Sequence, residues 1–433
     1  MKKTPAFLLA LLLCLNVYAR TGWTGEGRTV HTATQTMVKQ LDGKGGMFRS
    51  CVWGILAVNL KGDTLAAHNS CRLMVPASNM KIVTTAGALL KLGASFRFNT
   101  SLRTDGEVAD STLRGNLFIT GGGDPCLGNI FSYLPPEGYS FGKWKEALLA
   151  KGIRRIEGDI VGDGSYFSPE PAHSDWSTED FDCKDGVVPT GLCWRGSARD
   201  TIPDGPFAAA FHFKEWLRRD SSITVSGRAR EISPDNESSD SLFVLGDIPS
   251  APLREIIAIT NKRSDNYMAE TLLRQIGLST DSLDNYAAST ASLRKALSPI
   301  RMAGRSAGMR FADGSGLSRK NYLSPEFLVG VLRGMAGSKL YSTFRNSLPK
   351  PGDAGGTLRY RLPKADSETR NRIRMKSGSM NGVLCFSGYI LSPDGDSRKT
   401  IVFSIMVNNF SGKGRDLAEC MDKLTESLAG ENK

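Results

Sequence analysis

Ser78 and Lys81 are the first residues of this chain whose types and spacing could do chemistry. They follow Pro76-Ala77 and open a segment whose apolar residues recur at the helical period as far as Leu92. Positions three apart lie on one face of a helix, so the serine hydroxyl and the lysine amine can share a hydrogen bond. A lysine held partly out of water can act as the base for that hydroxyl. The pair predicts a serine nucleophile, although a capping serine followed by a surface lysine has the same spacing.

Two later motifs would complete such a site. Ser264-Asp265-Asn266 begins an amphipathic helical pattern, where Ser264 could relay a proton and Asn266 could bind a substrate amide. Lys376-Ser377-Gly378 precedes the strand-like segment 383–391. A cation and a hydroxyl there could receive a carboxylate, and the glycine would let a substrate backbone approach closely. Taken separately, the first motif also fits a helix cap and the second a turn between strands.

The order of the three motifs is more specific than any of them alone. Ser-x-x-Lys on a helix, then Ser-x-Asn, then Lys-Ser/Thr-Gly on a strand is the signature of penicillin-recognising enzymes. With it, the chain resembles the class C low-molecular-mass penicillin-binding proteins, the D-alanyl-D-alanine carboxypeptidase/endopeptidase family. The resemblance covers nearly the whole mature chain and includes Gly121–Pro125, Gly158–Asp163, Asp313–Arg319 and Gly356–Arg359. One departure is Ser377, where the family usually has threonine; the hydroxyl is kept.

The resemblance implies an α/β (α+β) fold. Its core would be a penicillin-binding-protein or serine β-lactamase-like transpeptidase domain, an antiparallel sheet flanked by helices, carrying β-rich inserted domains. Ser78 and Ser264 lie 186 positions apart, far more than in class A β-lactamases, and the surplus indicates the family's inserted domain pair. We expect a signal peptide at 1–19, a discontinuous catalytic domain at 20–95 and 251–433, and the inserted pair at 96–250.

Local patterns predict the elements that position these motifs. A hairpin should pair strands 52–60 and 64–69, and short strands at 117–120 and 156–161 should belong to the inserted region. The remaining predictions are helices at 78–92, 266–276 and 325–335, strands at 383–391 and 400–408, and a last helix with Leu417, Cys420, Met421, Leu424 and Leu428 on its apolar side.

The resemblance also implies a role for each motif residue. Ser78 would be the acylated nucleophile and Lys81 its base. Ser264, bridged to Lys376, would pass a proton to the departing D-alanine amine. The backbone N–H groups of Ser78 and Ser379 would form the oxyanion hole.

Substrate binding would fall to the other motif residues. Asn266 would hold the peptide amide, and Lys376 with Ser377 would meet the terminal carboxylate beside Gly378. Asp163 and Arg319 are candidates for recognising a diaminopimelate side chain, with a structural role equally open for both. No metal or cofactor is required. The chain has only four histidines, none at ligand spacing, so neither a metal site nor a Ser-His-Asp triad is expected.

The N-terminus and the charge indicate where the protein works. Lys2 and Lys3 precede the apolar run 7–17 and the cleavage pattern Val17-Tyr18-Ala19, which predicts a secretory signal peptide and export to the periplasm or cell envelope. Cys14 follows Leu13 and is interpreted as part of the apolar run rather than a lipidation site. The net charge of +11 falls to about +9 on cleavage and is scattered, so no nucleic acid is expected. Peripheral contact with an anionic wall or membrane surface and plain solubility both fit it.

In an oxidising compartment, two cysteine pairs could form disulfides. Cys51 and Cys71 bracket the predicted hairpin, and Cys183 and Cys193 close a short loop. Cys385 and Cys420 lie in apolar patterns typical of buried cysteine, and at least one thiol must remain because the mature count is odd.

The predicted function is that of a serine D-alanyl-D-alanine carboxypeptidase/endopeptidase, which would act on peptidoglycan stem peptides and be acylated by β-lactam antibiotics at Ser78. The sequence does not apportion the two activities. One alternative is a non-catalytic penicillin-sensing or wall-binding module, and another is a β-lactamase.

Overall fold

The computed structural model describes residues 28–41, 50–128, 139–177, 186, 188–192, 194, 205–233, 242–300 and 308–432. The predicted signal peptide, Cys14 and the predicted Cys183–Cys193 pair lie outside them. As far as it is described, the chain divides into two compact units. The first comprises Met1–Ala86, Asn261–Ser264 and Leu297–Lys433, and the second comprises Gly87–Thr260 and Asp265–Ala296. None of the helices described is both long and apolar enough to cross a membrane.

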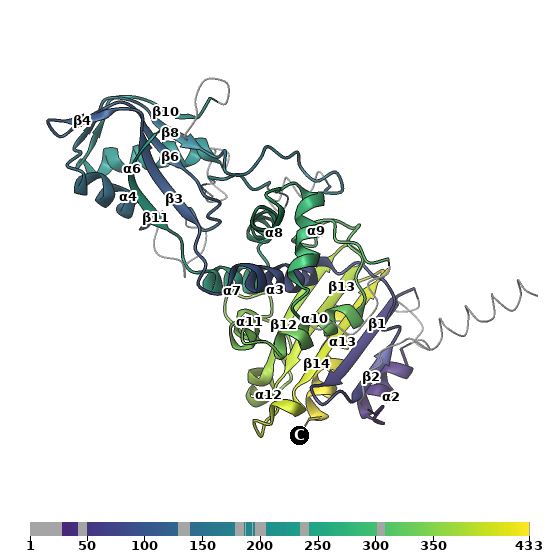
Figure 1. Ribbon diagram of the computed structural model, residues 1–433. Coiled ribbons are helices and arrows are strands. Elements are labelled where there is room, and N and C mark those ends of the chain that lie inside the picture. The colour runs from purple at the N-terminus through teal and green to yellow at the C-terminus, as the bar shows by residue number, and fades with distance from the viewer. Residues whose placement is uncertain are drawn as a thin grey trace, which may run out of the picture. The chain divides into compact units, whose positions relative to one another are not determined.

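A five-stranded antiparallel sheet forms the centre of the first unit, in the order β12-β13-β14-β1-β2 (Figure 1). Its strands are β1 (Val52–Asn59), β2 (Thr64–His68), β12 (Ile373–Met380), β13 (Val383–Ile390) and β14 (Ile401–Asn408). Val52 pairs with Asn408, so two distant parts of the chain meet at the middle of the sheet. Strand β12 is an edge strand, which leaves the hydrogen-bonding groups on its outer side available to other partners.

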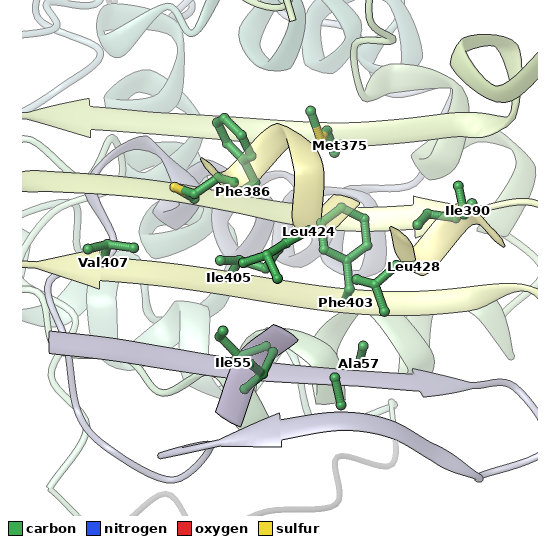
Figure 2. Packing of buried hydrophobic residues seen from close by; sticks show 14 of the residues in the cluster. Ile55, Ala57, Met375, Phe386, Ile390, Phe403, Ile405, Val407, Leu424 and Leu428 are labelled. Carbon is green, nitrogen blue, oxygen red and sulfur yellow. The ribbon is translucent and has the colours of Figure 1, made fainter. Parts of the chain in front are cut away.

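The amphipathic helix α13 (Gly414–Gly430) packs on one face of this sheet (Figure 2). Alternate residues of β1, including Ile55 and Ala57, point to that face because side chains alternate along a strand. Leu424 and Leu428 of the helix lie four positions apart and meet them. Together they form a buried apolar core, which holds the strands of the first unit in register.

Helix α10 (Pro325–Ala336) lies against the opposite face. At Gly54 of β1, the Cβ position faces α10, and a Cβ atom there would come within 2.5 Å of Met74 Sδ and 3.0 Å of Pro325 Cγ. The Tyr389 hydroxyl donates to the Leu332 carbonyl of the same helix at 2.6 Å. Smaller helices complete the first unit: α2 (Ala33–Lys39), α11 (Tyr341–Ser347), α12 (Ser367–Arg372), and the 3₁₀ turns η2 (Ala77–Asn79) and η3 (Ser397–Lys399).

The second unit contains two further sheets. A five-stranded sheet has the order β10-β8-β6-β3-β11, and a four-stranded sheet has the order β4-β5-β7-β9. Their strands are β3 (Asn99–Thr104), β4 (Glu107–Ala109), β5 (Thr112–Arg114), β6 (Leu117–Thr120), β7 (Arg155–Ile156), β8 (Ile160–Asp163), β9 (Thr224–Val225), β10 (Ala229–Glu231) and β11 (Phe243–Pro249). Helices α4 (Tyr139–Ala150) and α6 (Pro206–Asp220) contribute Trp144 and Phe213 to their buried core. Helices α8 (Asn266–Asp281) and α9 (Tyr286–Ala296) complete the unit.

The predicted local elements are present. The hairpin forms between β1 and β2, and the helix expected from Ser78 to Leu92 is the turn η2 followed by α3 (Met80–Leu92). The strand predicted at 156–161 is divided between β7 and β8, which belong to different sheets.

The predicted Cys51–Cys71 disulfide is wrong. Cys71 is exposed beyond the end of β2, and its Sγ donates to Glu326 Oε2 at 3.0 Å. Cys51 instead packs against the core under α13, because it continues the inward-facing alternation of β1. Cys420, on α13, packs against the same core.

Candidate active site

Ser78 sits in a tight turn at the start of α3. Ala77 before it has a φ of +46°, a left-handed conformation that costs a non-glycine residue energy. The Asn79 N–H donates to the Pro76 carbonyl at 3.1 Å and closes the turn. Gly316 packs against the Ala77 carbonyl so closely that a Cβ atom there would collide with it. Contact with Gly316, from a distant segment, therefore keeps the strained turn in place, and Ser78 within it is partly exposed.

Lys81 is fully buried and reaches Ser78 as the helical spacing predicts. Its Nζ donates to Ser78 Oγ at 3.1 Å and to the Ser315 carbonyl at 2.7 Å. The predicted contact between nucleophile and base is thus present. The second contact uses a backbone carbonyl from a segment far away in the sequence.

A second serine–lysine pair joins the other two motifs. Lys376, on β12, is fully buried, and its Nζ donates to Ser264 Oγ at 3.0 Å and to the Ser377 carbonyl at 2.6 Å. Burial lowers the pKa of Lys376 well below its usual range, and the positive charge of Lys81 lowers this pKa further. Both effects disfavour the charged form of this amine relative to a lysine in water.

Ser264 does not cap the following helix. The cap of α8 is Asp265, whose Oδ1 accepts the Met268 N–H at 2.8 Å. Ser264 ends helix α7 (Leu253–Arg263) with a left-handed φ of +61°, and its hydroxyl contacts Lys376. The helix-cap interpretation of Ser264 is wrong, and the strain marks a residue held in place for its hydroxyl.

The outer edge of β12 presents backbone groups beside Ser78. The Met375 N–H donates away from the sheet to the Pro349 carbonyl at 3.0 Å, so the N–H groups of Ser377 and Ser379 also face the outer edge. A Cβ atom on Gly378 would approach the Ser78 nitrogen to 2.9 Å. The strand and the nucleophile turn therefore touch. The motif lies within the edge strand β12, as its functional interpretation predicts, and the alternative of a turn between strands is excluded.

Three further predicted substrate-binding residues are divided between the two units. Asn266 is the first residue of α8 and belongs to the second unit. Asp163 ends β8 and is fully buried; its Oδ1 accepts the Ser165 N–H at 2.9 Å. Arg319 is exposed in the first unit, and its Nη2 donates to the Asn381 carbonyl at 2.7 Å, at the turn between β12 and β13.

Sequence reasoning gave no role to Ser315, Gly316 or Thr357. Ser315 supplies the carbonyl for Lys81, and the Ser377 hydroxyl donates to Thr357 Oγ1 at 3.2 Å. Asp313 stabilises the segment that contains Ser315, because its Oδ1 accepts the Gly316 N–H at 2.8 Å. The family motifs at 313–319 and 356–359, which contain these residues, were the signal in the sequence. The role of each residue depends on contacts between distant segments, which the motifs do not give. Among the residues described, no three His, Cys, Asp or Glu side chains gather closely enough to hold a metal ion.

Comparison with known proteins identifies the family. The D-Ala-D-Ala carboxypeptidase 3 (S13) family matches residues 41–193 and 205–428. The chain belongs to this family. It is a serine-type D-Ala-D-Ala carboxypeptidase of the penicillin-binding kind, as its motifs predict. The matched residues include both serine–lysine pairs and both units, so the family assignment does not rest on the motifs alone.

Individual relatives agree with this assignment. A D-alanyl-D-alanine carboxypeptidase of Actinomadura sp. (strain R39) is 28% identical over 83% of this chain and 78% of the relative. Penicillin binding protein 4 of Haemophilus influenzae has the same fold, with a TM-score of 0.72 and 21% identity over 92% of this chain and all of that one. A penicillin G-acylated predatory endopeptidase of Bdellovibrio bacteriovorus, in complex with an immunity protein, matches 88% of this chain and 93% of its own, with a TM-score of 0.57 and 17% identity.

Proposed function

We propose that this carboxypeptidase cleaves the terminal D-alanyl bond of peptidoglycan stem peptides through an acyl-enzyme on Ser78, and that it also acts as an endopeptidase on cross-linked peptides. The observation that carries the proposal is the double serine–lysine arrangement. Each of two buried lysines donates to a serine hydroxyl at about the same distance, 3.1 Å and 3.0 Å. Such an arrangement can remove a proton from one hydroxyl and deliver a proton from the other.

Acylation begins at Ser78. Its Oγ attacks the carbonyl carbon of the penultimate D-alanine while its proton passes to the Lys81 amine, 3.1 Å away. The carbonyl oxygen becomes an oxyanion, which the N–H groups of Ser78 and Ser379 stabilise. Removing one such donor typically costs about 10²–10³ in rate. Gly378 lets the strand come close enough to the nucleophile for both donors to serve one oxygen.

Departure of D-alanine uses the second pair. As the C–N bond breaks, the leaving nitrogen takes a proton from the Ser264 hydroxyl. Lys376 replaces it by relaying the proton that Lys81 took from Ser78, so both lysines return to their starting state. The Ser377 hydroxyl and Lys376 face the terminal carboxylate, and Asn266 holds the amide of the acyl part. Water then attacks the ester, which releases the shortened peptide and restores Ser78. A β-lactam follows the same first step and remains as the ester, which makes it a covalent inhibitor.

Substrate choice and location complete the proposal. Arg319, which is exposed, is the candidate for recognising the diaminopimelate side chain of the stem peptide. Asp163 is fully buried, which favours the structural role that the sequence also left open for it. The chain is exported by its N-terminal signal peptide, works in the periplasm or cell envelope, and keeps peripheral contact with the anionic wall. Residues 20–95 and 251–433 act as the catalytic domain, with 96–250 as the inserted domain pair. The basic composition supports contact with the wall.

Product analysis tests this function. Purified muropeptides, monomeric pentapeptide and cross-linked dimer, are digested, and the products are identified by mass. We expect loss of one D-alanine from the monomer and separation of the dimer into two stem peptides. Covalent penicillin binding without release of D-alanine would indicate a penicillin-sensing module instead. Fast turnover of nitrocefin, with no action on muropeptides, would indicate a β-lactamase.

A further inference from the structure

A polar pocket of about 460 Å³ lies beside the start of β12 in the first unit. It is lined by residues 350–354 of one loop and by Ser367, Arg370 and Asn371 around helix α12. None of the proposed catalytic residues lines it. The function proposed above therefore does not account for this pocket.

The charges around this pocket are mainly positive. Lys350 Nζ donates to Asn371 Oδ1 at 3.2 Å and lies 3.8 Å from the carboxylate of Asp353. Asp353 is partly engaged in the loop, because its Oδ2 accepts the Lys350 N–H at 3.2 Å. Arg370 forms no ion pair in the part of the chain that the structure describes. The lining thus offers two cations and one carboxylate.

Arg374, three residues after Asn371, adds to the positive potential. Its Nη1 donates to the Asn371 and Ile373 carbonyls, at 2.9 Å and 2.8 Å. Burial lowers the pKa of Arg374; Asp353 raises it, and the charge of Arg345 lowers it again. A cationic group that is half-buried near another cation is stabilised by any anion that binds there.

The position of the pocket along β12 shows on which side of the scissile bond of a bound substrate it would lie. In the proposed site, the scissile carbonyl lies at Ser379 and the carboxylate of the departing residue at Ser377. The next outward-facing N–H is that of Met375, which donates to the Pro349 carbonyl at 3.0 Å, and residue 350 begins the pocket. From Ser379 to Met375 the strand rises about 13 Å. The pocket therefore lies on the leaving-group side, beyond the reach of a single D-alanine.

We propose that this pocket is a leaving-strand subsite, which binds the carboxylates of the second stem peptide when the enzyme cleaves a cross-linked substrate. The proposal rests on the function proposed above. In a monomeric pentapeptide, the leaving group is one D-alanine and ends at Ser377. In a cross-linked dimer, the leaving amine carries a further acidic peptide, whose carboxylates Arg370 and Lys350 can bind by charge-assisted hydrogen bonds.

Charge-neutral variants test the subsite. Lys350→Gln, Arg370→Gln and the double variant are compared with Arg415→Gln, which removes an exposed cation at the start of α13. For each protein, kcat/KM is measured on pentapeptide monomer, on cross-linked dimer, and on a dimer whose leaving-strand carboxylates are amidated. The rate of penicillin acylation and the thermal midpoint are recorded as controls for the site and for folding.

The subsite predicts a selective loss. In the double variant, kcat/KM on the dimer should fall about tenfold, while monomer hydrolysis and penicillin acylation stay within about twofold of wild type. The amidated dimer should be a poorer substrate for wild type and unaffected by the substitutions. Equal effects on monomer and dimer, or no effect on either, would overturn the subsite. So would a wild-type enzyme that takes penicillin but leaves the dimer intact, whereas failure to take penicillin at Ser78 would overturn the proposed function itself.

Discussion

The two serine–lysine pairs have nearly equal geometry but different origins. Ser78 and Lys81 are three positions apart on one helical segment, and their contact of 3.1 Å follows from helix geometry. Ser264 and Lys376 are 112 positions apart, and their contact of 3.0 Å exists only because β12 and the end of α7 meet in the folded unit. In both pairs the lysine also donates to a backbone carbonyl.

The difference teaches what each pair depends on. The first pair depends on the turn before α3, so its geometry survives as long as Ala77 keeps its strained conformation. The second depends on long-range packing and on a lysine whose pKa is lowered by burial and by the charge of the first lysine. Because the charges disfavour one another, protonation of one amine makes the other a better proton donor. The variants below separate these dependencies, from the largest expected effect to the smallest.

Lys81→Met should cause the largest loss. It keeps the length of the side chain but removes the base from Ser78, so the second-order rate of penicillin acylation should fall about 10³–10⁴-fold. Stopped-flow measurement with a fluorescent penicillin checks this. Ser78 would not need Lys81 as its base if the variant retained more than about a tenth of the wild-type rate.

Lys376→Met should reduce acylation about 10²–10³-fold and change the pH dependence of stability. The pKa of Lys376 is lowered in the folded protein, so between that pKa and the ordinary value of 10.5 the unfolded chain binds the extra proton. The free energy of unfolding of wild type therefore contains a term that rises with pH over this window. Removal of the lysine abolishes that term.

Thermal melting over a series of pH values measures this effect. The Tm of Lys376→Met relative to wild type should be most favourable near neutral pH and should become less favourable as the pH approaches 10. A difference in Tm that does not vary with pH would contradict the lowered pKa of Lys376. Lys350→Met, which removes a half-exposed lysine of the same unit, is the matched control for the loss of a lysine side chain.

Two substitutions of Ser264 separate its hydroxyl from its backbone. Both Ser264→Ala and Ser264→Gly remove the hydroxyl, and each should slow hydrolysis of the pentapeptide about 10–10²-fold. Only glycine relieves the left-handed φ of +61°, so Ser264→Gly should be more stable than Ser264→Ala by about 1 kcal/mol. Urea unfolding compares the two variants. Equal stabilities would show that the backbone at Ser264 stores no strain.

Ser377→Thr should have the smallest effect. Threonine keeps the hydroxyl that contacts Thr357 and restores the residue usual in the family, so kcat/KM on pentapeptide should stay within about twofold of wild type. Ser377→Ala is the matched loss of the hydroxyl and should weaken substrate binding more. A threonine variant as slow as the alanine variant would exclude a simple hydroxyl contact at this position.

Much of the local structure and the family could be predicted from the sequence. Helical spacing gave the contact between Ser78 and Lys81, and alternating strand patterns gave β13 and β14. The three motifs together led to the correct family and fold. These features succeed because they depend on neighbouring residues or on motifs whose order is specific.

Long-range contacts could not be predicted in this way. Spacing favoured a Cys51–Cys71 bond, but the two ends of the hairpin point to different surroundings, and Cys71 contacts Glu326 instead. The carbonyl of Ser315 under Lys81 comes from a loop that reaches α3 only in the fold. The position of Ser264 in the sequence is typical of a helix cap. In the structure Asp265 caps α8, and the Ser264 hydroxyl accepts from Lys376.

Intact-protein mass spectrometry after incubation with penicillin G tests the central claim most directly. The account predicts that the mass rises by one penicilloyl group, that peptide mapping finds this group on Ser78, and that Ser78→Ala takes up none while it retains the wild-type melting temperature. A folded Ser78→Ala variant that still carries the adduct, or an adduct found on another serine, would contradict it.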